Sequence, residues 1–100
     1  MEKRALILDS ADNVASVIEA VRAGDTVLAG IGSDTQAVLA AEDIPFGFKI
    51  ALADIEAGQS VVKYGEIIGR ASQPIARGAL VHVHNVEGNR GRGDLQGRAD

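Results

Sequence analysis

The sequence predicts a mostly-β fold, a compact barrel or sandwich to which one helix is added. Short apolar segments recur along the 100 residues, and 12 glycines separate many of them. Strands this short, with turns this frequent, are typical of small barrels and sandwiches. One stretch, residues 12–22, instead spaces its apolar side chains by three and four residues, which is the repeat of a helix face.

The helix is expected over residues 12–22. Its apolar face consists of Val14, Val17, Ile18 and Val21. Residues 9–13 are rich in side chains that cap helix N-termini, and Gly24 is placed to end the helix in the left-handed conformation. Because β-branched residues are poor helix formers in isolation, we expect this helix to depend on packing against the sheet.

The other apolar segments are expected to be strands. They are Ala5–Leu8, Thr26–Ala29, Thr35–Ala41, Lys49–Leu52, Ser60–Lys63, Glu66–Ala71 and Leu80–Val86. A local pattern, apolar-x-x-Gly-x-x-Val, occurs three times, at residues 21–27, 55–61 and 75–81. It predicts a helical turn, a glycine at positive φ and entry into a strand, with strand starts near residues 26, 60 and 80. An ordinary turn explains it more simply than duplication does.

Composition and charge exclude several classes of function. The net charge of −4 argues against nucleic acids and anionic membranes as main partners. The absence of cysteine excludes disulfides, thiolate catalysis and cysteine-ligated metals. The N-terminal apolar run, Ala5–Leu8, is too short for a signal peptide, and no apolar run approaches the roughly 20 residues of a membrane span. We therefore expect a soluble, cytoplasmic protein.

The chain is long enough for a single domain, which we place at residues 1–88. Residues 89–100 contain several glycines and arginines and almost no apolar side chains. Such a segment cannot bury enough surface to order itself, so we expect a flexible tail.

The stretch Glu42–Leu52 is the first candidate site, because acidic residues lead into a Pro-Phe-Gly turn. It contains Phe46 and Phe48, two of the three aromatic residues in the chain. Loops that carry charge and aromatics between regular elements often bind ligands. The alternative is that both phenylalanines anchor the core and that Pro45–Gly47 only turns the chain.

His82 and His84 form the second candidate site. If residues 80–86 are one strand, both imidazoles lie on one face, while Val81 and Val83 face the core. His-x-His is a metal-ligand spacing, and a carboxylate such as Glu42 or Asp43, or a group from another chain, would complete the site. The alternative is a pair of solvated or hydrogen-bonded histidines.

Asn85 and two lysines complete the set of candidates. Asn85 would either position a substrate hydroxyl or close a turn. Lys49 and Lys63 adjoin apolar strand residues, and either would hold a substrate carboxylate or be a solvated lysine at a strand edge.

Four blocks of the sequence resemble the small N-terminal SAF-type domain of the altronate/galactarate dehydratase family. The blocks are Asp12-Asn13-Val14-Ala15, Glu42–Gly47 followed by Lys49–Leu52, Val62–Ala71 and Val81–Asn85. The resemblance implies a β-clip fold, in which short strands wrap around each other. In this family the small domain is paired with a much larger catalytic part, either fused or as a separate chain. The small subunit of sulfolactate sulfo-lyase is similar too.

The resemblance implies the small subunit of a lyase that completes the active site of a separate large subunit. Because about 85 ordered residues leave little room for a deep pocket, we expect the chain to be inactive alone. The reaction would remove a proton from carbon 2 and hydroxide from carbon 3 of a sugar acid. A divalent metal, iron or manganese, would be held mainly by the large subunit. The implied catalytic residues are His82, His84 and Lys49, and the implied substrate-binding residues are Glu42, Asp43 and Asn85.

One position departs from the family pattern. The family motif has histidine between Pro-Phe-Gly and Lys-Ile-Ala, whereas this chain has Phe48. Histidine titrates near neutrality and phenylalanine cannot, so Phe48 favours a second hypothesis. In that hypothesis the domain binds a small molecule or a protein without catalysing a reaction.

Overall fold

The computed structural model describes residues 2–88, and within this range the chain forms strands and no helix. The strands are β1 (Glu2–Leu6), β2 (Val14–Val17), β3 (Thr26–Ile31), β4 (Asp34–Leu39), β5 (Lys49–Ala51), β6 (Ser60–Lys63), β7 (Glu66–Ala71), β8 (Leu80–Val81) and β9 (Val86–Glu87). The predicted mostly-β class is confirmed. The predicted tail, residues 89–100, lies outside the described residues.

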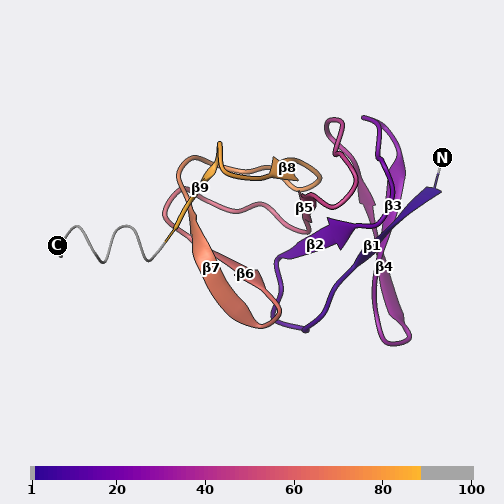
Figure 1. Cartoon of the computed structure of the whole chain (residues 1–100), viewed down its shortest axis with the longest axis horizontal. Helices are drawn as coiled ribbons and strands as arrows, with labels where there is room; N and C mark the ends of the chain where they lie inside the picture. Colours follow the sequence, from indigo (N-terminus) through magenta and orange to yellow (C-terminus); the bar gives the residue numbers. More distant parts are fainter. Residues whose placement is uncertain (1, 89–100) are drawn as a thin grey trace, which may run out of the picture.

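The strands form two sheets that lie side by side (Figure 1). The larger has the order β4-β3-β1-β2-β5-β8, and the smaller has the order β6-β7-β9. β1 and β3 run parallel, and the other strand pairs are antiparallel. Because β5 pairs with β2 on one side and with β8 on the other, residues far apart in sequence meet at β5.

The core consists of two aliphatic clusters. The first lies along the larger sheet and includes Ile44 and Ile50, both fully buried. The second joins the two sheets, because Val14 and Val81 of the larger sheet pack with Val61 of the smaller one. Burial of each such side chain contributes roughly 1.5–3 kcal/mol to folding. The aromatic residues add little to this core.

The predicted helix over residues 12–22 is wrong. Residues 14–17 form strand β2, in which Ala15 pairs with Ile50 of β5. Ile18, expected on the buried face of the helix, is 44% exposed. The β-branched valines suit a strand better than a helix, and here β2 lies between two partner strands that satisfy its backbone. Tertiary pairing therefore overrides the helical spacing.

The polar residues expected to cap this helix instead tie loops together. The carboxylate of Asp12 accepts hydrogen bonds from the backbone N–H groups of Leu8, Asp9 and Gly65, at 3.2, 3.1 and 2.8 Å. The side chain of Asn13 accepts from the N–H of Val62 and donates to the carbonyl of Ser60, at 2.8 and 2.9 Å. These bonds fasten the β1–β2 connection to the β6–β7 hairpin.

The predicted glycine turns are confirmed, and the strands after them begin at Thr26, Ser60 and Leu80. No helical turn precedes these glycines. Each turn instead begins at a residue of an isolated β-bridge. One bridge joins Val21 to Ile44, and the other joins Ile55 to Ile75. The bridge at Ile44 shows a fourth turn of the same kind, which the sequence pattern missed because Ile50 stands where the other copies have valine. The four turn glycines are Gly24, Gly47, Gly58 and Gly78, with φ of 91°, 87°, 89° and 89°.

Candidate functional site

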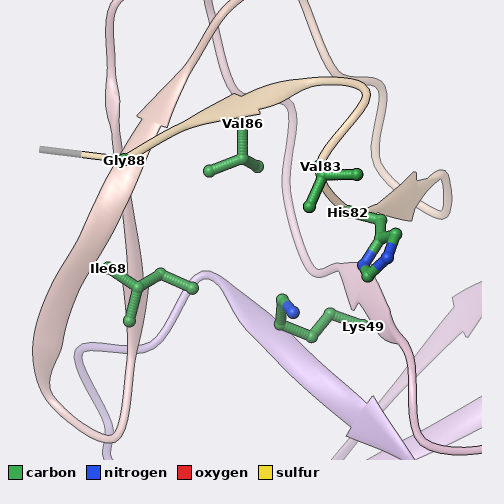
Figure 2. A pocket seen from close by; sticks show the side chains of 6 residues that line it. All are labelled: Lys49, Ile68, His82, Val83, Val86 and Gly88. Atoms are coloured by element: carbon green, nitrogen blue, oxygen red, sulfur yellow. The ribbon is translucent and has the colours of Figure 1, made fainter. Parts of the chain in front are cut away.

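A pocket of about 260 Å³ brings together a lysine and a histidine from separate parts of the chain (Figure 2). Lys49 comes from the first residue of β5, and His82 directly follows β8. The remaining wall is mostly apolar and comes from β7, β9 and their neighbours. The lining residues are Lys49, Ile68, His82, Val83, Val86 and Gly88. We place the candidate site here because two ionisable side chains share one partly apolar cavity.

Lys49 is fixed by strand pairing on both sides of β5, with Ser16 of β2 and Val81 of β8 as its partners. Its side chain is half-buried. Burial lowers the pKa of Lys49, and the nearby charge of Lys63 lowers it further. Within residues 2–88 no carboxylate forms an ion pair with Lys49. A bound anion would therefore stabilise its charged form.

His82 is half-buried, and its imidazole contacts the ring of Phe48. The ring centroids are 4.4 Å apart and the ring planes are inclined by 45°. Figure 2 shows the imidazole pointing into the pocket, above Lys49 in this view. Phe48 itself is half-buried and packs against the first core cluster, whereas Phe46 is 68% exposed. The expectation that both phenylalanines anchor the core therefore applies to Phe48 only.

The predicted single strand over residues 80–86 is wrong, and with it the shared face of the two histidines. Residues 82–85 form a turn between β8 and β9. Val81 is fully buried as expected, but Val83 is 79% exposed and lies at the pocket wall. His84 is exposed and does not line the pocket, and its carbonyl accepts a hydrogen bond from Nε2 of Gln73 at 3.3 Å.

Glu42 and Asp43 lie away from the pocket and bind backbone groups. Oε2 of Glu42 accepts from the N–H of Leu80, and Oδ1 of Asp43 accepts from the N–H of Ala23, both at 2.9 Å. These carboxylates hold neighbouring turns in place. The structure thus brings Lys49 and His82 together and does not bring either acidic residue to them.

Sequence reasoning missed the apolar wall of the pocket. Ile67 and Ile68 stand next to each other in β7, and both are exposed. Successive side chains of a strand point to opposite faces, so two adjacent isoleucines cannot both enter one core. That doublet was the available signal of an apolar surface at β7. No comparable signal marks Val86, which reaches the wall only because the 82–85 turn reverses the chain.

The sequence was compared with known proteins. The family model of the altronate/galactarate dehydratase SAF domain matches residues 3–89. The chain belongs to this family. Among its relatives, altronate dehydratase of Escherichia coli K12 is 41% identical over 78 residues, which is 78% of this chain and 15% of that enzyme. The (2R)-sulfolactate sulfo-lyase subunit alpha of Chromohalobacter salexigens is 42% identical over 77 residues, 74% of this chain and 81% of that subunit.

Two further relatives have the same names. Altronate dehydratase of Bacillus subtilis 168 is 39% identical over 79 residues, covering 78% of this chain and 15% of that enzyme. The (2R)-sulfolactate sulfo-lyase subunit alpha of Paracoccus pantotrophus is 44% identical over 48 residues, covering 48% of this chain and 72% of that subunit. This SAF domain chain therefore spans about 15% of the length of the altronate dehydratases that it matches.

The described part of the SAF domain does not fit a metal site. Residues 2–88 contain no group of three or more histidine or acidic side chains placed to hold one ion. His82 and His84 do not share a face, and the acidic residues expected as further ligands bind backbone N–H groups. Within the same range, no helix is long and apolar enough to cross a bilayer.

Proposed function

We propose that this SAF domain chain is the small component of a lyase acting on a hydroxy acid, and that a larger chain completes the active site. Altronate dehydratase and sulfolactate sulfo-lyase subunit alpha, the names of its relatives, support the reaction class. The observation that carries the proposal for this chain is the pocket that holds Lys49 and His82 together. No residue within 2–88 neutralises the lysine.

In this proposal Lys49 binds the acid group of the substrate. A half-buried ammonium group without a carboxylate partner forms a charge-assisted hydrogen bond with an incoming carboxylate or sulfonate. This contact would hold the substrate with its reacting carbons under the imidazole of His82. The apolar wall excludes water from one side of the substrate and strengthens the electrostatic contact.

His82 is the proposed acid–base group of the elimination. In a dehydration, a base removes the proton from carbon 2, the electron pair forms the double bond, and hydroxide leaves carbon 3 with a proton. An imidazole suits either proton transfer, because its ring nitrogens can both accept and donate a proton. His84, Glu42 and Asp43 remain predicted site residues, but their positions in residues 2–88 do not favour a role in this pocket.

The larger chain would cover the pocket, which opens at the surface of the domain. It would also hold the iron or manganese that the family resemblance implies, since residues 2–88 do not fit a metal. No step assigned to Lys49 or His82 depends on that ion. The proposed partners are therefore a large catalytic chain and a sugar acid or sulfonate.

The two histidines provide a matched test. The chain would be co-produced with a larger chain of the same lyase family and assayed with altronate, galactarate and sulfolactate in the presence of iron or manganese. We expect no turnover from the small chain alone. In the complex, His82→Ala should lower kcat by about 10²- to 10⁴-fold, the usual contribution of a general acid or base, and His84→Ala should change it less than about two-fold.

Two outcomes would contradict this proposal. Turnover by the isolated chain at ordinary enzyme rates would remove the need for a larger partner. Equal loss of activity in the two histidine variants, with both folded, would remove the special role of His82. Thermal melts of both variants check folding.

The second candidate is a module that binds an acid without catalysis. Phe48, at the position where the family motif has histidine, favours this alternative because a phenyl ring cannot transfer protons. It predicts that the isolated chain binds one of the three acids, measured by calorimetry, and that His82→Ala leaves the activity of the complex unchanged.

A further inference from the structure

The turn that carries His82 is closed by a single buried side chain, Asn85, which is 5% exposed. Its Oδ1 accepts a hydrogen bond from the backbone N–H of His82 at 2.9 Å. Its Nδ2 donates to the carbonyl of Leu80 at 2.8 Å. Each polar end of the amide therefore makes a hydrogen bond within the turn, and because the side chain is buried, a substrate hydroxyl has little access to Asn85.

The backbone of Asn85 adds two further connections. Its N–H donates to the carbonyl of His82 at 3.1 Å, and its carbonyl accepts from the N–H of Ser72, just beyond β7, at 3.0 Å. The N–H and the carbonyl of His82 thus both bind the same residue. A four-residue turn fastened in this way leaves the Cα–Cβ direction of His82 little freedom.

The imidazole ring is held separately. It lies against Phe48, which precedes β5, with ring centroids 4.4 Å apart. Asn85 thus fixes the backbone of His82 from within the turn, and Phe48 fixes the ring from the facing strand region. The remaining side of the ring faces the pocket that contains Lys49 (Figure 2).

We propose that Asn85 is the positioning residue of the site, which sets the imidazole of His82 over Lys49. The proposal rests on the proposed function for its catalytic consequence, and on the geometry of the turn alone for its structural consequence. It replaces the expectation that Asn85 binds substrate. A displacement of about 1 Å in a reacting group can lower a rate by about 100-fold, so this side chain affects catalysis without touching substrate.

The chain offers a matched control on the same turn. Nε2 of Gln73 also ties the turn, through the carbonyl of His84 at 3.3 Å, but this bond is exposed and does not involve His82. Gln73→Ala removes one tether and leaves the two bonds of Asn85 intact. Asn85→Ala removes both of those bonds. Asn85→Asp keeps an acceptor for the N–H of His82 but cannot donate to Leu80 when ionised.

The first measurement uses NMR on the isolated full chain. The unmodified chain and Gln73→Ala should show nuclear Overhauser contacts between the rings of Phe48 and His82. They should also show ring-current displacement of the His82 ring protons relative to those of His84. Asn85→Ala should lose both signals, and Asn85→Asp should show them weakened. Folded Asn85→Ala with unchanged signals would overturn the proposal. If that variant does not fold, Asn85→Asp with unchanged signals would do the same.

The second measurement is the kinetics of the complex with the larger lyase chain. Asn85→Ala should lower kcat by about 10- to 100-fold while KM changes less than about three-fold, and Gln73→Ala should match the unmodified complex. A rise in KM with unchanged kcat would show a substrate contact and overturn the positioning role. If the unmodified complex lacks lyase activity, the proposed function fails, while the NMR measurement still decides whether Asn85 positions His82.

Discussion

Replacement of Lys49 by methionine should separate substrate binding from stability. Methionine preserves the length and apolar stem of the side chain but removes the charge. At about 4 Å, an ammonium–carboxylate pair is worth about 4 kcal/mol at an effective dielectric constant of about 20. Because Lys49 is only half-buried, we take the lower range of hydrogen bonds to charged groups, about 1.5–3 kcal/mol. This corresponds to a KM or Kd that rises by about 10- to 100-fold.

The same change should not destabilise the domain. Burial and the charge of Lys63 lower the pKa of Lys49, so the folded state holds this proton less tightly than the unfolded state does. Below the lowered pKa both states are protonated, and the charged lysine disfavours folding. As the pH rises from the lowered pKa towards 10.5, the folded state releases the proton first and this cost disappears. Lys49→Met should therefore have an equal or higher Tm at neutral pH, and the difference should shrink as the medium becomes alkaline.

Lys63→Met is the matched control for this test. Lys63 is also half-buried, but its Nζ lies 4.5 Å from the ring centroid of Tyr64, and Lys63 does not line the pocket. It should change KM less than about three-fold. Calorimetric binding of sulfolactate and altronate, steady-state kinetics of the complex and thermal melts provide the readouts. Unchanged substrate affinity in Lys49→Met, or an equal loss in both variants, would refute the assignment of Lys49 as the anion site.

Two further predictions concern the fold that supports the pocket. Burial raises the pKa of Asp12, but hydrogen bonds from backbone N–H groups, that of Gly65 foremost, lower it more. Because solvent screens this partly exposed carboxylate, Asp12→Asn should cost about 1 kcal/mol of unfolding free energy at pH 7. The difference in unfolding free energy between the two proteins, measured by chemical denaturation, should disappear as the pH falls below 3.8 and through the lowered pKa. A difference that does not change with pH would contradict this role of Asp12. Gly78→Ala should cost at least about 3 kcal/mol, because its Cβ would clash with the carbonyl oxygen of Leu39. Gly58→Ala has the same φ of 89° but open space around the new Cβ, so it should cost only about 1 kcal/mol. Equal melting temperatures for the two glycine variants would show that the close approach has no effect.

The sequence predicted the strands well wherever local chemistry decides the conformation. Ser60–Lys63 and Glu66–Ala71 match β6 and β7 residue for residue, because a hairpin of β-branched residues around Gly65 is defined locally. The glycine turns were predictable for the same reason, since a positive φ favours glycine wherever it occurs.

The failures come from contacts that residue spacing does not show. Residues 14–21 have helical spacing, yet pairing with β1 and β5 makes residues 14–17 a strand. The 80–86 segment reads as a continuous strand, yet the buried amide of Asn85 folds it into a turn. No spacing rule could anticipate either result, because one depends on partner strands elsewhere in the chain and the other on the two side-chain hydrogen bonds of Asn85.

The candidate site also has a part that the sequence predicted and a part that it did not. Lys49, His82 and Asn85 were identified from residue type, but their arrangement was not. The pairing of β5 with β8 aligns Lys49 with Val81, so that His82, the next residue, lies beside the lysine. The grouping of His82 with His84 assumed that the strand continues to residue 86, whereas β8 ends at Val81.

The contact between Phe48 and His82 bears on whether a phenylalanine at this position is compatible with catalysis. The phenyl ring, with its centroid 4.4 Å from that of the imidazole, provides a surface that orients the ring of His82. Phenylalanine at this position therefore packs against His82 but cannot transfer protons. If the pocket is catalytic, it must act through one histidine. Phe48→His in the complex tests this step, because a second titrating group should broaden the pH profile of kcat, whereas a purely packing position should leave its shape unchanged.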